Sequence, residues 1–130
     1  MKGTGITVVF MFILFCLNVC LGCAQTAPIV TAPAPRTADV NKDGKPDITY
    51  HSDGKNVTKI EADTNLDGKP DVTVNLKDGK FESAEIDANQ DGKVEKRYYD
   101  SNSFNEWIND NHPEFHDDLY FADGILTLKY

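Results

Sequence analysis

One seven-residue phrase, Asp-x-Asn-x-Asp-Gly-Lys, occurs three times in this chain. The copies begin at Asp39, Asp63 and Asp87, and they are spaced 24 residues apart. Positions 1, 3 and 5 carry carboxylate or amide oxygens that can reach one concavity, and Gly at position 6 permits the sharp bend that this requires. Another acidic residue follows at position 9. Clustered hard oxygens suit a hard divalent cation, and calcium takes six to eight of them at about 2.3–2.6 Å.

The predicted ligands are the side chains at positions 1, 3, 5 and 9, together with the backbone carbonyl at position 7. They are Asp39, Asn41, Asp43, Lys45 and Asp47 in the first loop; Asp63, Asn65, Asp67, Lys69 and Asp71 in the second; and Asp87, Asn89, Asp91, Lys93 and Glu95 in the third. A turn that binds nothing is the alternative for any single loop, because Asp, Asn and Gly are ordinary turn residues. Three copies in one register favour Ca²⁺ sites, and exported loops of this kind bind with a Kd of roughly 10⁻⁴–10⁻³ M.

Over nine residues each, the loops resemble the Asp-x-Asn/Asp-x-Asp-Gly-x-x-Asp loops of integrin-type propellers and thrombospondin type 3 repeats. The resemblance implies that positions 1, 3, 5, 7 and 9 bind the ion. An EF-hand or dockerin loop would have an acidic residue at position 12, where this chain has Tyr50, Val74 and Tyr98. The third loop departs from the pattern, with Val94 in place of Pro and Glu95 in place of Asp.

Strands must position these loops. Period-2 alternation predicts five of them, at Asp47–His51, Asn56–Ala62, Asp71–Leu76, Lys80–Ile86 and Val94–Tyr99. Asp-Gly turns at 52–55 and 77–80 favour tight hairpins, because Asp-Gly adopts the positive φ angles that such turns require. The loops then join hairpin to hairpin in an antiparallel meander.

The alternation gives the meander one apolar and one polar face. The expected buried residues are Ile48, Tyr50, Ile60, Ala62, Val72, Val74, Leu76, Ala84 and Ile86. The polar face is expected to carry Phe81, Arg97 and Tyr99 as well.

The segment after Tyr99 is the predicted cover for the apolar face. A capping box, Ser103 to Glu106, predicts a helix start, and Phe104, Trp107 and Ile108 form one helical stripe that Phe115 extends. Pro113 should end or restart the helix near His112. A closing hairpin follows, from Leu119–Phe121 to Ile125–Tyr130. The predicted fold class is α+β: an antiparallel β-meander of hairpin repeats joined by calcium loops, covered by a C-terminal helix and closing hairpin.

The N-terminus predicts export. Residues 1–22 have a basic start and an apolar run typical of a signal peptide, with a membrane anchor helix as the alternative. Gly22-Cys23 resembles the lipobox of bacterial lipoproteins, which implies cleavage before Cys23 and its modification by a diacylglyceryl thioether and an N-acyl chain such as palmitate. Residues 23–38 are Ala-, Thr- and Pro-rich and read as a tether, which leaves 39–130 as the calcium-binding repeat domain.

Charge and motif content limit the function. The formal net charge is −8, and nucleic acid is not an expected partner, because its recognition requires a basic face. His112 and His116 lack the order of a zinc-binding helix motif, and Glu61 and Glu85 are either outer-shell oxygens of the loops or solvated strand residues.

The sequence carries no nucleophile–base pair and no cofactor fingerprint. We therefore expect a non-catalytic, calcium-binding envelope lipoprotein, anchored to an outer membrane or cell surface, in which calcium is mainly structural. It would serve as a binding or scaffolding module for a protein or glycan. The alternatives are a calcium sensor whose loops order when the ion binds, and an unrecognised enzyme.

Overall fold

The computed structural model describes residues 35–128. The expected signal peptide, Cys23 and most of the expected tether lie outside these residues, as do Lys129 and Tyr130. No helix in the described range is long and apolar enough to cross a membrane.

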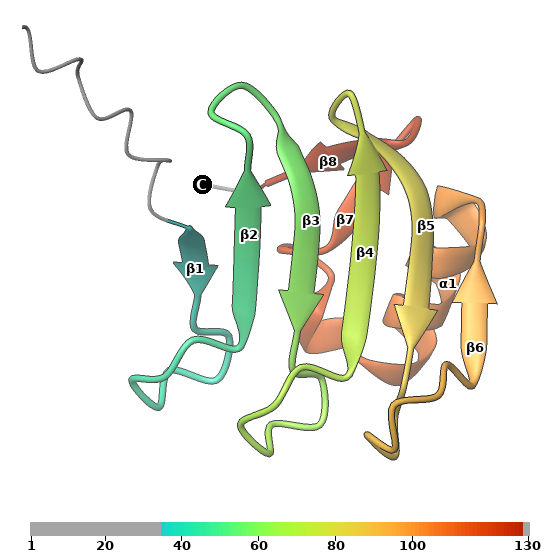
Figure 1. Ribbon diagram of the computed structural model, residues 1–130. Coiled ribbons are helices and arrows are strands. Elements are labelled where there is room, and N and C mark those ends of the chain that lie inside the picture. The colour runs from blue at the N-terminus through green and yellow to red at the C-terminus, as the bar shows by residue number, and fades with distance from the viewer. Residues whose placement is uncertain (1–34, 129–130) are drawn as a thin grey trace, which may run out of the picture. The chain divides into compact units, whose positions relative to one another are not determined.

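Eight strands form one antiparallel sheet (Figure 1). They are β1 (Arg36–Ala38), β2 (Ile48–Ser52), β3 (Val57–Ala62), β4 (Val72–Lys77), β5 (Lys80–Ile86), β6 (Lys96–Tyr98), β7 (Tyr120–Ala122) and β8 (Ile125–Thr127). The order is β1-β2-β3-β4-β5-β8-β7, and β6 pairs with β5 beside β8. The predicted antiparallel meander and the α+β class are confirmed.

The sheet begins earlier than the sequence suggested. Three residues of the expected tether form β1, in which Ala38 lies opposite Ile48 of β2. The Asp47 N–H donates to the Ala38 carbonyl at 2.8 Å, so the first loop closes between two paired strands. All three loops therefore have the same place in the architecture, each joining one strand to the next.

The hairpin turns lie where Asp-Gly pairs predicted them. Asp78 and Gly79 have φ angles of 52° and 77°, and Asp123 and Gly124 have 52° and 76°. Positive φ at both central residues is the type I′ pattern, whose twist matches that of paired strands. At the 52–55 turn, the Asp53 carboxylate instead accepts the backbone N–H groups of the two residues that follow Gly54.

The apolar face of the meander is the core. All nine residues predicted to be buried there are at most 7% exposed. The expectation for Phe81 was wrong. A register shift between Asn75 and Leu76 pairs Phe81 with Leu76, so Phe81 joins the apolar face and its ring packs 5.1 Å from that of Phe121. A β-bulge of this kind moves the following residues onto the other face.

The apolar face is covered by α1 (Ser101–Asn111) and by the short 3₁₀ helix η1 (Pro113–Phe115). Phe104, Ile108 and Phe115 are fully buried, whereas Trp107 of the predicted stripe is only partly buried against the core. The helix ends before Pro113. The predicted start was late. The N-cap is Asp100, whose carboxylate accepts the Ser103 N–H at 2.8 Å, so Ser103 is the donor rather than the cap.

Candidate metal centre

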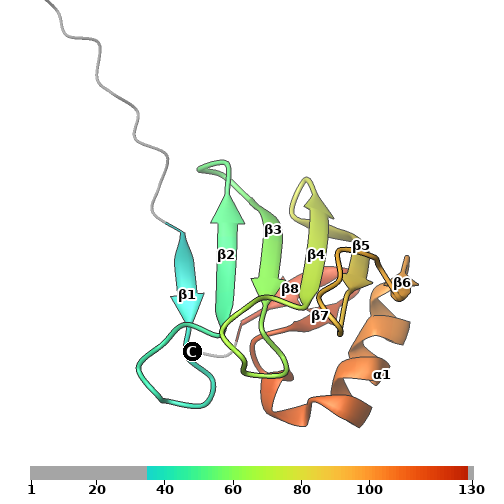
Figure 2. The same ribbon diagram turned by 60° about the horizontal axis from the view of Figure 1, so that its bottom comes forward.

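The three Asp-rich loops lie in a row at one end of the sheet (Figure 2). The first loop (39–47) joins β1 to β2, the second (63–71) joins β3 to β4, and the third (87–95) joins β5 to β6. The hairpin turns between β2 and β3 and between β4 and β5 lie at the other end. Strict up-and-down alternation of antiparallel strands thus brings the three repeated motifs together.

The three loops share one backbone conformation. Position 4, which is Lys42, Leu66 or Gln90, has a φ angle of 61°, 59° or 55°. The glycine at position 6 has a φ angle of 89°, 93° or 84°. Residues other than glycine seldom adopt left-handed φ, at a cost of roughly 1–2 kcal/mol, so other interactions must stabilise this shape.

Hydrogen bonds within each loop supply that stabilisation. In the second loop, Asp63 Oδ1 and Oδ2 accept the backbone N–H groups of Asp67 and Gly68 at 3.1 and 2.6 Å. Asn65 Oδ1 accepts the same Asp67 N–H at 3.0 Å, and Asp67 Oδ1 accepts that of Lys69 at 3.0 Å. The first and third loops repeat all four bonds. The side chains at positions 1, 3 and 5 therefore all fold inward over the loop backbone.

The position-9 carboxylate closes each loop at its neck, the point where the chain enters and leaves the loop. Asp71 Oδ1 accepts the Thr64 N–H at 2.6 Å, and Asp71 Oδ2 accepts the Thr64 hydroxyl at 2.7 Å. Asp47 and Glu95 accept the position-2 N–H of their own loops at 2.8 and 2.6 Å. Asp47 and Asp71 are each only 6% exposed, whereas Glu95 is exposed. The predicted ligand at position 9 therefore also has a structural role that the motif alone did not indicate.

Backbone hydrogen bonds connect the necks of neighbouring loops. The Asp63 N–H donates to the Asp47 carbonyl at 2.8 Å, and the Asp87 N–H donates to the Asp71 carbonyl at 2.9 Å. The second loop has a neighbour on each side, and its Asp63, like Thr64 and Asp71, is buried. The three loops are thus a joined series whose middle member is the best protected.

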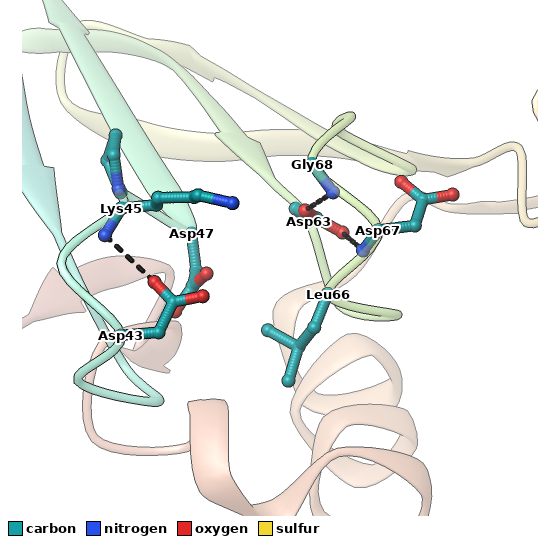
Figure 3. A pocket seen from close by; sticks show the side chains of 8 residues that line it. Asp43, Lys45, Asp47, Asp63, Leu66, Asp67 and Gly68 are labelled. Carbon is teal, nitrogen blue, oxygen red and sulfur yellow. Dashed lines mark hydrogen bonds between the residues drawn. The ribbon is translucent and has the colours of Figure 1, made fainter.

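A small pocket of about 80 Å³ separates the first and second loops (Figure 3). It is lined by Asp43, Lys45, Pro46 and Asp47 of the first loop and by Asp63, Leu66, Asp67 and Gly68 of the second. In Figure 3, Leu66 extends into the space opposite Asp43 and Asp47. An apolar side chain thus faces the acidic side of the first loop.

Between the second and third loops, a polar side chain occupies the corresponding place. The Gln90 Nε2 donates to Asp67 Oδ2 at 2.8 Å and to the Lys69 carbonyl at 3.4 Å. This contact is the main cause of the lowered pKa of Asp67. Neither Gln90 nor Leu66 was predicted to belong to the site, because position 4 is variable in the motif and its contacts depend on how the loops stack.

The donor set consists of hard oxygens from carboxylates, amides and backbone carbonyls, which is the set that calcium prefers. Each carboxylate oxygen has more than one acceptor site, so a hydrogen bond from the backbone leaves capacity for a cation. Among residues 35–128, no three His, Cys, Asp or Glu side chains are gathered into a ready-made metal-binding cluster. The predicted ligands of each loop are of mixed type, because position 3 is an Asn and the position-9 carboxylate is already hydrogen-bonded to the backbone at the neck of the loop.

The other candidate residues have protein partners on the surface. Glu61 accepts hydrogen bonds from Lys59 and His51, and these contacts lower its pKa. Glu85 pairs with Arg97 at 2.6 Å. Both glutamates therefore make ion pairs on the polar face of the sheet.

The two C-terminal histidines lie beside different acidic residues. His112 Nδ1 is 3.9 Å from Glu114, and its ring packs 5.1 Å from that of Trp107. His116 Nδ1 is 3.2 Å from Asp117.

Comparison with protein-family models, with curated proteins and with solved structures finds no match for this chain.

Proposed function

We propose that this protein is a calcium-binding, non-catalytic lipoprotein of the cell envelope, in which calcium stabilises the folded repeat domain. The observation that carries the proposal is the identical construction of the three loops. Each has the same two left-handed positions and the same inward-folded carboxylate and amide oxygens. A turn without a ligand needs only one or two such residues, so repetition of the whole set favours a shared cation chemistry.

Electrostatics supports a structural role for the ion. Each loop carries acidic side chains at positions 1, 5 and 9 of a nine-residue stretch, and the whole chain has a formal net charge of −8. Like charges held close together oppose folding, and a bound divalent cation relieves this repulsion. An ion that binds only the folded loops adds its binding free energy to stability.

A titration tests calcium binding directly. The chelator-treated protein should release or absorb heat on addition of CaCl₂ in isothermal calorimetry, with an affinity in the millimolar to submillimolar range typical of extracellular modules. Replacing the three position-1 residues by Asn (Asp39→Asn, Asp63→Asn and Asp87→Asn) should abolish or greatly weaken this binding.

A matched variant controls for charge. Asp53→Asn, Asp78→Asn and Asp123→Asn together remove the same formal charge from three hairpin turns outside the loops. This variant should keep wild-type binding. No heat from the wild-type protein at millimolar CaCl₂, or an equal loss in both variants, would refute the proposal.

A sensing role is the second candidate, and hydrogen exchange separates the two. The loop hydrogen bonds are made by the chain itself, which favours loops that keep their shape and so a structural role. Slow exchange of the Gly44, Gly68 and Gly92 amides with and without calcium would support that role. Exchange that slows greatly in the sheet only when calcium is added would instead identify a sensor.

The envelope location and partner rest on the N-terminal sequence and on the polar sheet face. Cys23→Ser should move the protein from the membrane fraction to the soluble exported fraction if Cys23 carries the lipid.

The uncovered face of β2–β5 presents Thr, Asn, Ser and paired charges, a surface suited to a polar protein or glycan partner. Affinity capture with the calcium-loaded protein should recover that partner, and a variant with altered face residues should not.

A further inference from the structure

The position-4 side chain of each later loop faces the loop that precedes it. Leu66 of the second loop lines the pocket that Asp43 and Lys45 of the first loop also line. Gln90 of the third loop contacts Asp67 and Lys69 of the second. The two relations are similar, because in each case a position-4 residue faces positions 5 and 7 of the loop before it: Leu66 does so across a pocket, and Gln90 by direct contact. Their φ angles of 59° and 55° show that the two residues also share one backbone conformation.

The chemistry of the two position-4 residues differs. Leu66 offers the first loop only hydrocarbon. Gln90 offers the second loop an amide group, and the atoms within its reach are Asp67 Oδ2 at 2.8 Å and the Lys69 carbonyl oxygen at 3.4 Å. Positions 5 and 7 are two of the proposed calcium ligands. A side chain that reaches both ligands of one site is placed beside the ion that they would share.

A glutamine amide can serve such an ion. The group carries an acceptor oxygen as well as the NH₂ donor, and amide oxygens are among the ligands that calcium accepts. The terminal torsion of Gln is broad, so exchanging the NH₂ for the oxygen costs little. Without calcium, the NH₂ group of Gln90 is the suitable partner for the two oxygens of the second loop. With calcium bound, the amide oxygen of Gln90 is the suitable partner for the ion.

We propose that Gln90 of the third loop is an additional ligand of the second calcium site, so that the second loop binds calcium more tightly than the first. This inference rests on the proposed calcium-binding function. The first loop lacks such a ligand because its neighbour presents Leu66. The third loop lacks one because the chain continues from it into β6 and α1 rather than into a fourth loop.

The test is a CaCl₂ titration of the intact protein followed by amide NMR. Gly44, Gly68 and Gly92 occupy position 6 of the three loops, so their signals report each site separately. In the wild-type protein, the Gly68 signal should reach its bound position at a lower calcium concentration than the Gly44 signal. This order is itself the first expected result.

Three variants make the assignment specific. Gln90→Leu copies the residue that already occupies position 4 of the second loop, so the backbone accommodates it. It should weaken binding at Gly68 by about 10-fold or more, the range seen when a supporting group of a metal site is removed, and leave Gly44 nearly unchanged. Gln90→Glu keeps a ligand oxygen and should retain or strengthen binding at Gly68. Leu66→Gln should strengthen binding at Gly44.

The outcomes distinguish a failure of this inference from a failure of the proposed calcium-binding function on which it rests. If no glycine signal moves with calcium, the proposed function fails and the role of Gln90 fails with it. If all three loops bind but Gln90→Leu leaves Gly68 unchanged, or tightens it, then Gln90 is a bystander or a competitor and only the inference is overturned. Equal weakening at all three loops would show a general loss of stability and would also overturn it.

Discussion

A buried asparagine ties the cover of the domain to the edge of its sheet. Asn105 of α1 is only 7% exposed. Its Nδ2 donates to the Phe121 carbonyl at 2.7 Å, and its Oδ1 accepts the Phe121 N–H at 3.1 Å. One side chain thus satisfies both backbone groups of a residue in β7, as a neighbouring strand would. Because β7 ends the sheet, the helix uses this amide in place of a further strand.

Asn105→Ala should lower the free energy of unfolding by about 2–6 kcal/mol, because it leaves two buried backbone groups without partners at roughly 1–3 kcal/mol each. Chemical denaturation provides the measurement. Asn102→Ala is the matched control, since Asn102 is exposed on the same helix and should cost little. Similar small losses in both variants would show that water replaces the Asn105 bonds.

The N-cap carboxylate of Asp100 is expected to make the stability of α1 depend on pH. The Ser103 backbone N–H, followed by the Ser103 hydroxyl, donates to this carboxylate and lowers its pKa below the ordinary 3.8. A carboxyl whose pKa is lowered by folding stabilises the native state above its unfolded pKa and loses that contribution as the pH falls through the folded value.

Asp100→Asn keeps an N-cap acceptor but removes the charge that favours a helix N-terminus. The wild-type protein should therefore melt at a higher temperature than the variant at neutral pH. The difference should shrink as the pH falls below 3.8. Thermal melts of both proteins across this range give the comparison, in which titration of the other carboxyls cancels. A difference that does not change with pH would contradict the assignment.

At the scale of elements, the loop glycines are required for their backbone conformation alone. A Cβ atom built at Gly68, where φ is +93°, meets nothing within 4 Å, and the same is true at Gly44 and Gly92. At Gly79 of the β4–β5 turn, where φ is +77°, a Cβ would lie 3.3 Å from the Asn56 side chain. The cost of a side chain in the loops is therefore conformational rather than steric.

Gly68→Ala should lower the free energy of unfolding by roughly 1–2 kcal/mol, the cost of a left-handed L-residue. Gly68→Asn should cost less, since Asn tolerates this conformation better than other residues. Urea denaturation of the two variants measures the difference. A loss well above 2 kcal/mol for Ala, with Asn no better, would point to a close contact that the loop geometry does not contain.

Elements with strong local signals could be predicted from the sequence. The alternation of Ile48 and Tyr50, and of Val72 and Val74, identified the buried face, because side chains in a strand point to opposite sides in turn. Asp-Gly pairs located the hairpins. The helix stripe also identified Phe104 and Ile108 as core residues. Each of these signals depends only on neighbouring residues.

The features that were missed depend on residues distant in the sequence. β1 has three residues and no apolar run, and it is a strand only because loop closure pairs Ala38 with Ile48. Phe81 changed face because its strand bulges at Glu82, where the pairing of β5 with β4 shifts register, and one strand read alone does not reveal the register of its pairing. Gln90 meets Asp67 across 23 residues, which no local pattern predicts. For the site, the motif identified the inward-folded oxygens, but the neck closure and the contacts between loops followed from stacking.

At the scale of the whole molecule, the fold places the hydrophobic core on one face of the sheet and the acidic loops at one end of it. One face is apolar and is covered by α1, η1 and the final hairpin. One end collects three acidic loops, because each of them joins two neighbouring antiparallel strands at that end. The concentration of acidic groups at that end opposes folding, so the molecule is expected to be most stable when a cation is bound there.

Calcium should therefore raise the melting temperature of the intact protein, and a chelator should reverse the rise. If each site has a Kd of about 10⁻⁴–10⁻³ M, about 10 mM CaCl₂ will nearly saturate it. Each occupied site should then raise the free energy of unfolding by about 1.4–2.7 kcal/mol, because only the folded loops bind calcium. Circular dichroism melts in CaCl₂ and in chelator measure the shift. MgCl₂ at the same concentration is the control for ionic screening and should give a smaller shift, because Mg²⁺ is smaller and demands near-octahedral geometry. Equal stabilisation by both salts would mean that calcium acts through screening of the acidic end, and no shift with either would remove the structural role of the ion.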